Sequence, residues 1–242
     1  MAAQHLDALD ALDALREGSP AYSVSAATSG AVMDGGLNRY FNVLPYDHSL
    51  LPGAYLNASL IPPLGSHSYV ATQAPLPATF QTFYEHIVAT GTDTIVNLTP
   101  VVERGIRKSD PYWEADALGD GWSVSVDSEA AGDIPGLTVR TLTISAPEHT
   151  HQVTQLHFES WPDHGVVPSE TLIALANAVQ TTRKQDPVWV HCSAGIGRSG
   201  TLIGVLLAME HDDPQVSPVD MAAKITAHMR EQRAGMVQTS GH

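Results

Sequence analysis

Hydrophobic and polar positions along the chain predict strands in two different settings. The segments TIVNL and VWV, at residues 94–98 and 188–190, are apolar without polar alternation, which is typical of strands buried on both faces. Polar and apolar residues alternate in SVSV, TVRTLTIS and THQVTQLHF between residues 122 and 158. This alternation predicts antiparallel strands that turn at residues 132–136.

Apolar residues at helical spacing predict helices between and after these strands. Residues 69–88 predict a strand, a proline turn and a helix with one apolar face made of Phe80, Phe83, Tyr84, Ile87 and Val88. Two later helical patterns begin at Ser169 and Ser217, where a serine can cap a helix N-terminus. Their apolar positions, which we expect in the core, are Leu172, Ile173, Leu175, Ala176 and Val179 in the first and Met221, Ile225 and Met229 in the second.

The N-terminal segment HLDALDALDAL, residues 5–15, repeats leucine and aspartate at every third position. Leucines at this spacing drift across about half of a helix surface. We therefore predict a short helix laid on the domain, with Asp7, Asp10 and Asp13 facing outward; a helix that binds a partner protein is the alternative. Residues 17–36, rich in Gly, Ser and Ala, predict a flexible connection, so the expected units are residues 1–36 and one larger domain over 37–242.

Composition narrows the class of protein and its compartment. The chain has 242 residues, of which 43% are hydrophobic, enough for a substantial core. Its 26 acidic and 12 basic residues give a net charge of −14, which argues against nucleic acid or an anionic membrane as partner. One cysteine excludes an intrachain disulfide and fits a reducing compartment. Because we find neither a secretory signal nor a run of roughly 18 apolar residues, we expect a cytosolic, or alternatively nuclear, protein.

The strand VWV leads into the single cysteine, Cys192, and a run of small residues that precedes a buried helical segment, LIGVLL. Gly195, Gly197 and Gly200 let this backbone curl tightly and aim successive N–H groups into one concavity at a helix N-terminus. Such a concavity binds anions. Cys192 lies on one rim, and Arg198, a permanent cation that can donate two parallel hydrogen bonds, lies on the other.

These groups together suit a cysteine nucleophile. Aligned N–H groups, a helix N-terminus and a nearby arginine stabilise the thiolate, and the same donors can hold three phosphoryl oxygens. The alternative is a buried structural cysteine before an ordinary glycine-rich turn, since one Cys and one Arg at this spacing can occur by chance. The whole string HCSAGIGRSGT, however, resembles the active-site signature of the cysteine-based protein tyrosine phosphatases.

The resemblance implies a role for each residue of this string. Cys192 attacks phosphorus while Arg198 and the loop amides hold the phosphate oxygens. Those amides belong to Ser193, Ala194, Gly195, Ile196, Gly197 and Arg198. Ser199 assists the departure of the thiolate, and His191 supports its orientation and ionisation.

Two further motifs match the same family. WPDHGV places Asp163 between Pro and Gly on a loop able to swing, as an acid that approaches a substrate and then admits water requires; an aspartate in a tight turn is the alternative. RAGMVQT, residues 233–239, resembles the family's glutamine loop and places Gln238 over the active site. The resemblance implies that Asp163 protonates the leaving phenolate and then, with Gln238, positions and activates water.

Residues upstream resemble the family's substrate-recognition segments. In NRYFN, Tyr40 falls where the family has the ring that stacks on phosphotyrosine, although a half-buried loop aromatic is the alternative. Asn42 stands where an aspartate commonly holds the peptide backbone. In VVERGIRKSDPYW, Glu103 matches the glutamate that orients Arg198, and Lys108 matches a lysine near the acid loop; a solvated loop of mixed charge is the alternative.

The implied fold is α/β, a twisted mixed β-sheet flanked by helices, with the cysteine loop between a strand and a helix. The implied reaction is hydrolysis of phosphotyrosine in proteins or peptides, with no cofactor and no metal, no nucleic-acid partner and no membrane span. His149 and His151, which would share a strand face, are a weak alternative as metal ligands.

Two other functions stay open at this point. A dual-specificity or phosphoinositide phosphatase shares the cysteine loop but has a shallower or more basic pocket, against which Tyr40 and the low basicity argue. A catalytically inactive phosphotyrosine-binding module typically lacks the acid or the nucleophile, and both are present here. A second glutamine usually lies four residues after the first in this family; here that position is His242, and we expect a short or absent closing segment.

Overall fold

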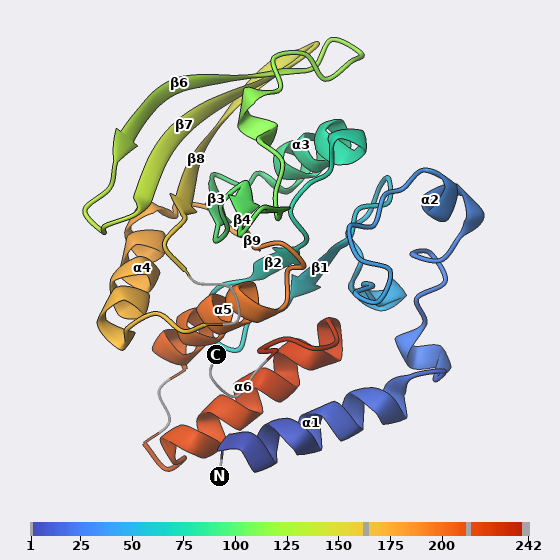
Figure 1. The fold of residues 1–242 in the computed structure, drawn as a ribbon, viewed down its shortest axis with the longest axis vertical. Coiled ribbons are helices and arrows are strands. Elements are labelled where there is room, and N and C mark those ends of the chain that lie inside the picture. Colours follow the sequence, from blue (N-terminus) through green and yellow to red (C-terminus); the bar gives the residue numbers. More distant parts are fainter. Residues whose placement is uncertain (1, 162–164, 212–213, 239–242) are drawn as a thin grey trace.

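A seven-stranded mixed sheet runs through the computed structural model, which describes residues 2–161, 165–211 and 214–238 (Figure 1). The strands, in spatial order, are β1 (Ala58–Ile61), β2 (Tyr69–Thr72), β9 (Val188–His191), β3 (Thr94–Asn97), β8 (His149–Phe158), β7 (Leu137–Ala146) and β6 (Ser123–Ala131). The central strands β2, β9, β3 and β8 are parallel, and the outer pairs are antiparallel. The expected mixed sheet and the predicted antiparallel strands before residue 158 are confirmed.

Helices cover both faces of the sheet, because the short central strands are apolar on both sides. Val70, Ile95 and Trp189 pack against α3 (Phe80–Thr90), whereas neighbouring residues of the same strands pack against α4 (Ser169–Thr182) and α5 (Gly197–Glu210). Burying apolar surface on both faces is the main source of stability for such a layered sheet. The predicted α/β fold is thereby confirmed (Figure 1).

Two details of the predicted helices differ in the structure. Ser217 caps α6 (Pro218–Gln232) as expected, by accepting a hydrogen bond from the N–H of Asp220. Ser169, by contrast, is the first residue of α4 rather than its cap, because Pro168 occupies the capping position. Ile173 on α4 is half exposed, since the helix buries only the narrower stripe of Leu175, Ala176 and Val179.

The N-terminal helix α1 (Ala2–Arg16) forms as predicted and lies along α6 on the side remote from the sheet (Figure 1). Asp7 and Asp10 are exposed as predicted, but the prediction that the aspartates face outward is wrong for Asp13, whose side chain is largely buried. The carboxylates of Asp10 and Asp13 both accept hydrogen bonds from Arg230 of α6, while Leu15 is 78% exposed. The buried guanidinium of Arg230 is paired with these carboxylates, and this pairing outweighs the weak amphipathic preference of a three-residue repeat.

The remaining short elements surround the sheet. Residues 17–36 contain a 3₁₀ helix, Pro20–Tyr22, and helix α2 (Gly30–Asp34), with Ala27 and Val32 buried. Two further 3₁₀ helices, Asp47–Ser49 and Pro77–Thr79, precede β1 and α3 respectively. A small hairpin joins β4 (Val102–Glu103) to β5 (Ile106–Arg107), and a 3₁₀ helix, Tyr112–Glu114, follows it.

Candidate active site

Cys192 directly follows β9, an inner strand of the parallel group, and the loop after it ends in α5. In the parallel register His191 lies opposite Thr72 of β2 and Asn97 of β3, so three strands end at the same edge of the sheet. Gly195 has a φ of +75°, and a Cβ there would lie 2.2 Å from the carbonyl oxygen of Thr72. A glycine is therefore required for the loop to curl this tightly against β2.

The loop borders a cavity of about 280 Å³. Ten of the predicted site residues line it: Tyr40, Asn42, Lys108, Cys192, Ser193, Ala194, Ile196, Gly197, Arg198 and Gln238. Four segments far apart in the sequence thus meet at one place. Glu103, His191, Gly195 and Ser199 are not among the residues that line the cavity, and Asp163 lies outside the described residues.

The carbonyl groups of the cysteine loop are held by donors from outside it. The N–H of Ala74 donates to the oxygen of Ser193 at 2.9 Å, and the guanidinium of Arg233 donates to the oxygens of Ala194 and Gly195 at 2.9 and 3.0 Å. In a planar trans peptide the next N–H points opposite to the carbonyl. The following amides therefore point away from these donors, and that of Gly195 donates to Cys192 Sγ at 3.3 Å.

Arg233 is fully buried and has no carboxylate partner among the described residues. Its remaining N–H groups donate to Asn57 Oδ1 at 2.7 Å and Ser59 Oγ at 3.3 Å. Burial lowers the pKa of Arg233 to about 10, so the side chain remains a cation near neutral pH. The positive charge behind the loop stabilises an anion at the loop, and sequence reasoning missed it because an arginine after a helix is usually exposed.

Glu103, Leu98 and Thr99, all within the described ranges, hold Arg198 in place. Its guanidinium donates to Glu103 Oε2 at 2.7 Å, to the carbonyl oxygen of Leu98 at 3.2 Å and to Thr99 Oγ1 at 3.1 Å. The predicted pairing of Glu103 with Arg198 is thus present in the structure, with both side chains largely buried. Such a pair fixes the direction in which the remaining N–H groups can point.

The segment NRYFN, residues 38–42, is connected to the cysteine loop by a hydrogen bond of Tyr40. Its hydroxyl lies 2.8 Å from Ser193 Oγ, which itself donates to the carbonyl oxygen of Lys108 at 2.7 Å. Because the single hydrogen of Ser193 Oγ is used on Lys108, the Tyr40 hydroxyl is the donor of the first bond. The neighbouring Phe41 is 85% exposed.

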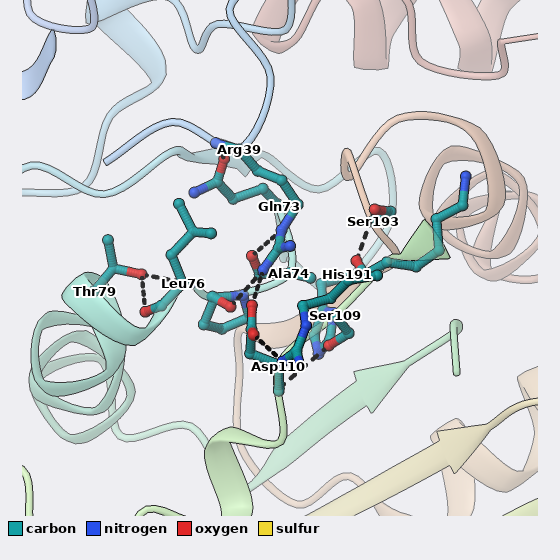
Figure 2. A network of polar contacts seen from close by, with 12 residues as sticks. Arg39, Gln73, Ala74, Leu76, Thr79, Ser109, Asp110, His191 and Ser193 are labelled. Atoms are coloured by element: carbon teal, nitrogen blue, oxygen red, sulfur yellow. Dashed lines mark hydrogen bonds and ion pairs between the residues drawn. The ribbon is translucent and has the colours of Figure 1, made fainter. Parts of the chain in front are cut away.

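A second set of polar contacts, not predicted from the sequence, holds the same segment through Arg39 (Figure 2). Arg39 donates to the carbonyl oxygens of Ala74 and Pro75 and to Asp110 Oδ2, at 3.0, 2.9 and 2.6 Å. Arg107 donates to the other oxygen of Asp110 at 2.7 Å. Although burial opposes ionisation, the hydrogen bonds from Arg39 and Arg107 hold the pKa of Asp110 below its usual value.

His191 is buried beneath the cysteine and remains neutral, because burial lowers its pKa to about 3. Nδ1 lies 3.1 Å from the carbonyl oxygen of Cys192, and Nε2 lies 2.7 Å from the hydroxyl of Tyr112. A carbonyl only accepts, so Nδ1 carries the proton and Nε2 accepts from Tyr112. Gln155 completes the chain by donating to the Tyr112 oxygen at 2.8 Å.

Three further residues named in the sequence analysis, Ser199, His149 and His151, have distinct surroundings. Ser199 Oγ is buried and has no hydrogen-bond partner within the described part of the chain, which is unusual for a buried hydroxyl. Among the same residues no group of three or more metal-ligating side chains occurs. His151 Nε2 instead lies 2.5 Å from the carbonyl oxygen of Thr92, and His149 packs edge-on against Trp122.

Comparisons with known proteins agree on one family. Residues 36–242 match the family model described as protein-tyrosine phosphatase. The chain is 37% identical over 240 residues to human receptor-type tyrosine-protein phosphatase H, a match that covers 90% of this chain and 21% of that protein. The chain therefore spans about a fifth of the length of this curated relative. No helix in the described ranges has both the length and the apolar character needed to cross a membrane.

Solved structures give the same picture. The human phosphatase PTPN18, in complex with phosphopeptides of HER2, superposes with a TM-score of 0.87 at 26% identity, covering 100% of this chain and 88% of that chain. The Trypanosoma cruzi protein tyrosine phosphatase TcPTP1 superposes with a TM-score of 0.84 at 31% identity, covering 99% and 87%. The similarity in fold thus extends over the whole sheet and its helices.

Proposed function

The chain belongs to the protein-tyrosine phosphatase family, and from this premise we propose that it hydrolyses phosphotyrosine in proteins through a phosphocysteine at Cys192. One observation carries the proposal: Cys192 borders a cavity in which loop amides and the guanidinium of Arg198 converge. Because the loop carbonyls are held outward by Arg233 and Ala74, the amides are oriented before any substrate binds. Preorganised donors of this kind stabilise charge that develops on phosphoryl oxygens.

In the first half-reaction the Cys192 thiolate attacks phosphorus while Arg198 holds two phosphoryl oxygens. The bond between phosphorus and the tyrosine oxygen breaks, and the phenolate takes the proton of Asp163. We assign this role to Asp163 from its motif alone. The neutral His191 beneath the loop donates to the carbonyl of Cys192, which fixes the peptide group next to the nucleophile.

In the second half-reaction water replaces the cysteine at phosphorus. Gln238 lines the cavity and positions the water, and Asp163 accepts its proton. The sulfur leaves as a thiolate with its electron pair. Ser199 Oγ, buried and without a partner among the described residues, supplies a hydroxyl that can donate to this thiolate.

Selectivity for phosphotyrosine is supported by the walls of the cavity. The half-buried ring of Tyr40, held by Ser193, forms a side wall against which a phenyl ring can stack. The related PTPN18 binds phosphopeptides of HER2, as its structure describes. A dual-specificity or phosphoinositide phosphatase is disfavoured because Lys108 and Arg198 are the only basic side chains among the described residues that line the cavity. A free catalytic thiol also favours a reducing compartment such as the cytosol.

The direct test measures turnover of p-nitrophenyl phosphate and of a phosphotyrosine peptide, with a phosphoserine peptide of the same sequence as control. We expect turnover of the first two and none of the third. Asp163→Ala tests the assigned acid, because nitrophenolate needs little protonation whereas a tyrosine phenolate needs it fully. The variant should lose far more activity on the peptide; equal losses on both substrates contradict the acid role of Asp163.

A further inference from the structure

Val237, the residue before Gln238, has a φ of +59°. This left-handed conformation is costly for a β-branched residue and persists only where surrounding contacts impose it. The neighbouring Gly235 is also left-handed, with a φ of +72°. The backbone that presents Gln238 to the cavity is therefore held in a conformation that it would not adopt alone.

Contacts from three sides impose this conformation. The N–H of Val237 donates to the carbonyl oxygen of Ile196 in the cysteine loop at 3.1 Å. A Cβ on Gly200 of α5 would lie 2.5 Å from the Val237 nitrogen, so a glycine there permits the approach. On the third side, Arg230 donates to the carbonyl oxygens of Met236 and Val237 at 2.8 and 3.3 Å.

Arg230 is itself held by the N-terminal helix α1. Its side chain is 1% exposed and donates to Asp10 Oδ1 at 2.6 Å and to Asp13 Oδ2 at 3.2 Å. Asp13 also accepts a hydrogen bond from the N–H of Gly235 at 3.0 Å, so it contacts the glutamine loop directly as well as through Arg230. Helix α1 lies along α6, which carries Arg230 (Figure 1).

We propose that Asp13 of α1, together with Arg230, positions the glutamine loop and so determines how selectively water attacks the phosphocysteine. This inference rests on the proposed function and assigns a positioning role to a helix that precedes the residues matching the family model. The step affected is the second one. The oxygen of water or of a competing alcohol bonds to phosphorus, the phosphorus–sulfur bond breaks, the thiolate keeps the electron pair, and the proton passes to Asp163.

A loosened glutamine loop should therefore leave the first step intact and change the second. The test compares the wild-type chain with Asp13→Ala and Asp13→Asn in stopped-flow turnover of p-nitrophenyl phosphate, with and without glycerol. For Asp13→Ala we expect an unchanged burst rate of nitrophenol release and a steady-state rate lower by about threefold to thirtyfold. In glycerol, the amount of free phosphate should also be lower than the amount of nitrophenol, and this difference should be larger for the variant than for the wild type. The missing phosphate should be recovered as glycerol phosphate.

Asp13 Oδ2 accepts from Arg230 and Gly235, and Oδ1 accepts from Arg16 at 3.1 Å. Asp13→Asn separates the hydrogen bond with Gly235 from the charge pairing with the two arginines. The amide oxygen can still accept the N–H of Gly235, but the charge that pairs with Arg230 is lost, so an intermediate partition ratio is expected. Asp7→Asn is the matched control, because Asp7 lies exposed on the same helix and the substitution changes the net charge by the same amount. It should match the wild type in burst rate, steady-state rate and partition.

The burst amplitude counts folded active sites, so a loss of folded protein does not imitate the expected result. If Asp13→Ala does not fold, Asp10→Ala replaces it, since the Asp10 side chain is 62% exposed and its loss is tolerated more easily. A wild-type partition ratio in the folded variants overturns the inference, as does a proportional loss of burst rate and steady-state rate. No turnover by the wild type overturns the proposed function instead, and this inference with it.

Discussion

Two buried arginines, three positions apart, hold the two loops of the active site in different ways. Arg233 holds the cysteine loop through carbonyl, amide and hydroxyl oxygens, all neutral acceptors. Arg230 holds the glutamine loop and is paired with two carboxylates from α1. Both side chains are buried, so both must have every donor satisfied, but only one of them is neutralised.

The difference in pairing gives the two arginines different roles: Arg233 acts mainly through its charge, and Arg230 mainly by holding the backbone in place. A buried cation without a carboxylate partner keeps its field, and that of Arg233 acts directly behind the loop that receives a phosphate. Arg230 and Arg16 together balance the charges of Asp10 and Asp13, so Arg230 contributes hydrogen bonds and rigidity rather than potential. Variants on the cysteine-loop side should therefore impair phosphate binding or both half-reactions, whereas variants on the glutamine-loop side should impair only the second.

The largest effect is expected from Cys192→Ser, which separates chemistry from binding on the cysteine-loop side. Serine cannot serve as the nucleophile here, so turnover should fall by at least about 10⁴-fold. Phosphate binding should persist, because the amides and Arg198 are unchanged. Turnover of p-nitrophenyl phosphate and titration with a phosphotyrosine peptide measure the two effects. If peptide binding is lost together with turnover, the loop amides and Arg198 are not sufficient to bind the phosphate group.

The next largest effect is expected from Arg233→Met, which removes the buried charge and the donors to two loop carbonyls. By analogy with removal of a preorganised donor, kcat/KM should fall by about 10²–10³-fold. Inhibition by inorganic phosphate should weaken in parallel, because the loop amides lose their orientation. Asp13→Asn serves as the contrast, since it should leave phosphate inhibition unchanged. Unchanged phosphate inhibition in Arg233→Met contradicts the electrostatic role, provided that the variant retains its circular dichroism spectrum.

The cysteine-loop side could be predicted largely from the sequence, because its determinants are contiguous. Strand VWV, the glycines that follow it and the helix after them form one segment, and each local preference agrees with the final fold. Glu103 and Tyr40 contact this segment in the structure, and only the resemblance of their motifs to those of a known family connects them to it from the sequence. Local physics alone leaves both as ordinary loop residues.

The hydrogen bonds and ion pairs that hold the active-site loops could not be predicted from the sequence, because each joins residues that are distant along the chain. Asp13 and Arg230 are 217 positions apart, and a repeat of aspartates on a helix normally indicates a solvated face. Tyr112 lies in a segment of mixed charge without a helix or strand pattern, yet it donates to His191, 79 positions away. Arg39 and Asp110 are likewise brought together only by the fold. Buried polar pairs of this kind are set by tertiary packing, which periodicity does not report.

The third prediction concerns the pH dependence of stability on the cysteine-loop side. The pKa of His191 is about 3 in the folded chain and about 6.5 in an unfolded one, so between these values the unfolded chain binds more protons. Stability should fall as the pH drops from 6.5 toward 3, by about 1.4 kcal/mol per pH unit for each excess proton. His191→Asn should reduce this slope by about one proton, as measured by urea unfolding at several pH values. His157, whose pKa is also lowered by burial, remains in both proteins. An unchanged slope in the variant shows that His191 is not the buried group that titrates.

The smallest effect is expected from Tyr40→Phe, which keeps the ring and removes only the hydroxyl that donates to Ser193 Oγ. Ser193 Oγ still donates to Lys108, so no buried donor is left without a partner, and the loss should be that of one ordinary hydrogen bond. The KM for a phosphotyrosine peptide should rise by about threefold to tenfold, while kcat and the kinetics of p-nitrophenyl phosphate stay unchanged. Tyr40→Ala removes the ring as well and should raise the peptide KM further, so the difference between the two variants isolates ring stacking from the hydrogen bond.

Equal peptide kinetics for Tyr40→Phe and Tyr40→Ala reject a stacking role for the ring, because they assign the whole effect to the hydroxyl. A matching loss on p-nitrophenyl phosphate instead shows that Tyr40 supports the cysteine loop rather than the peptide.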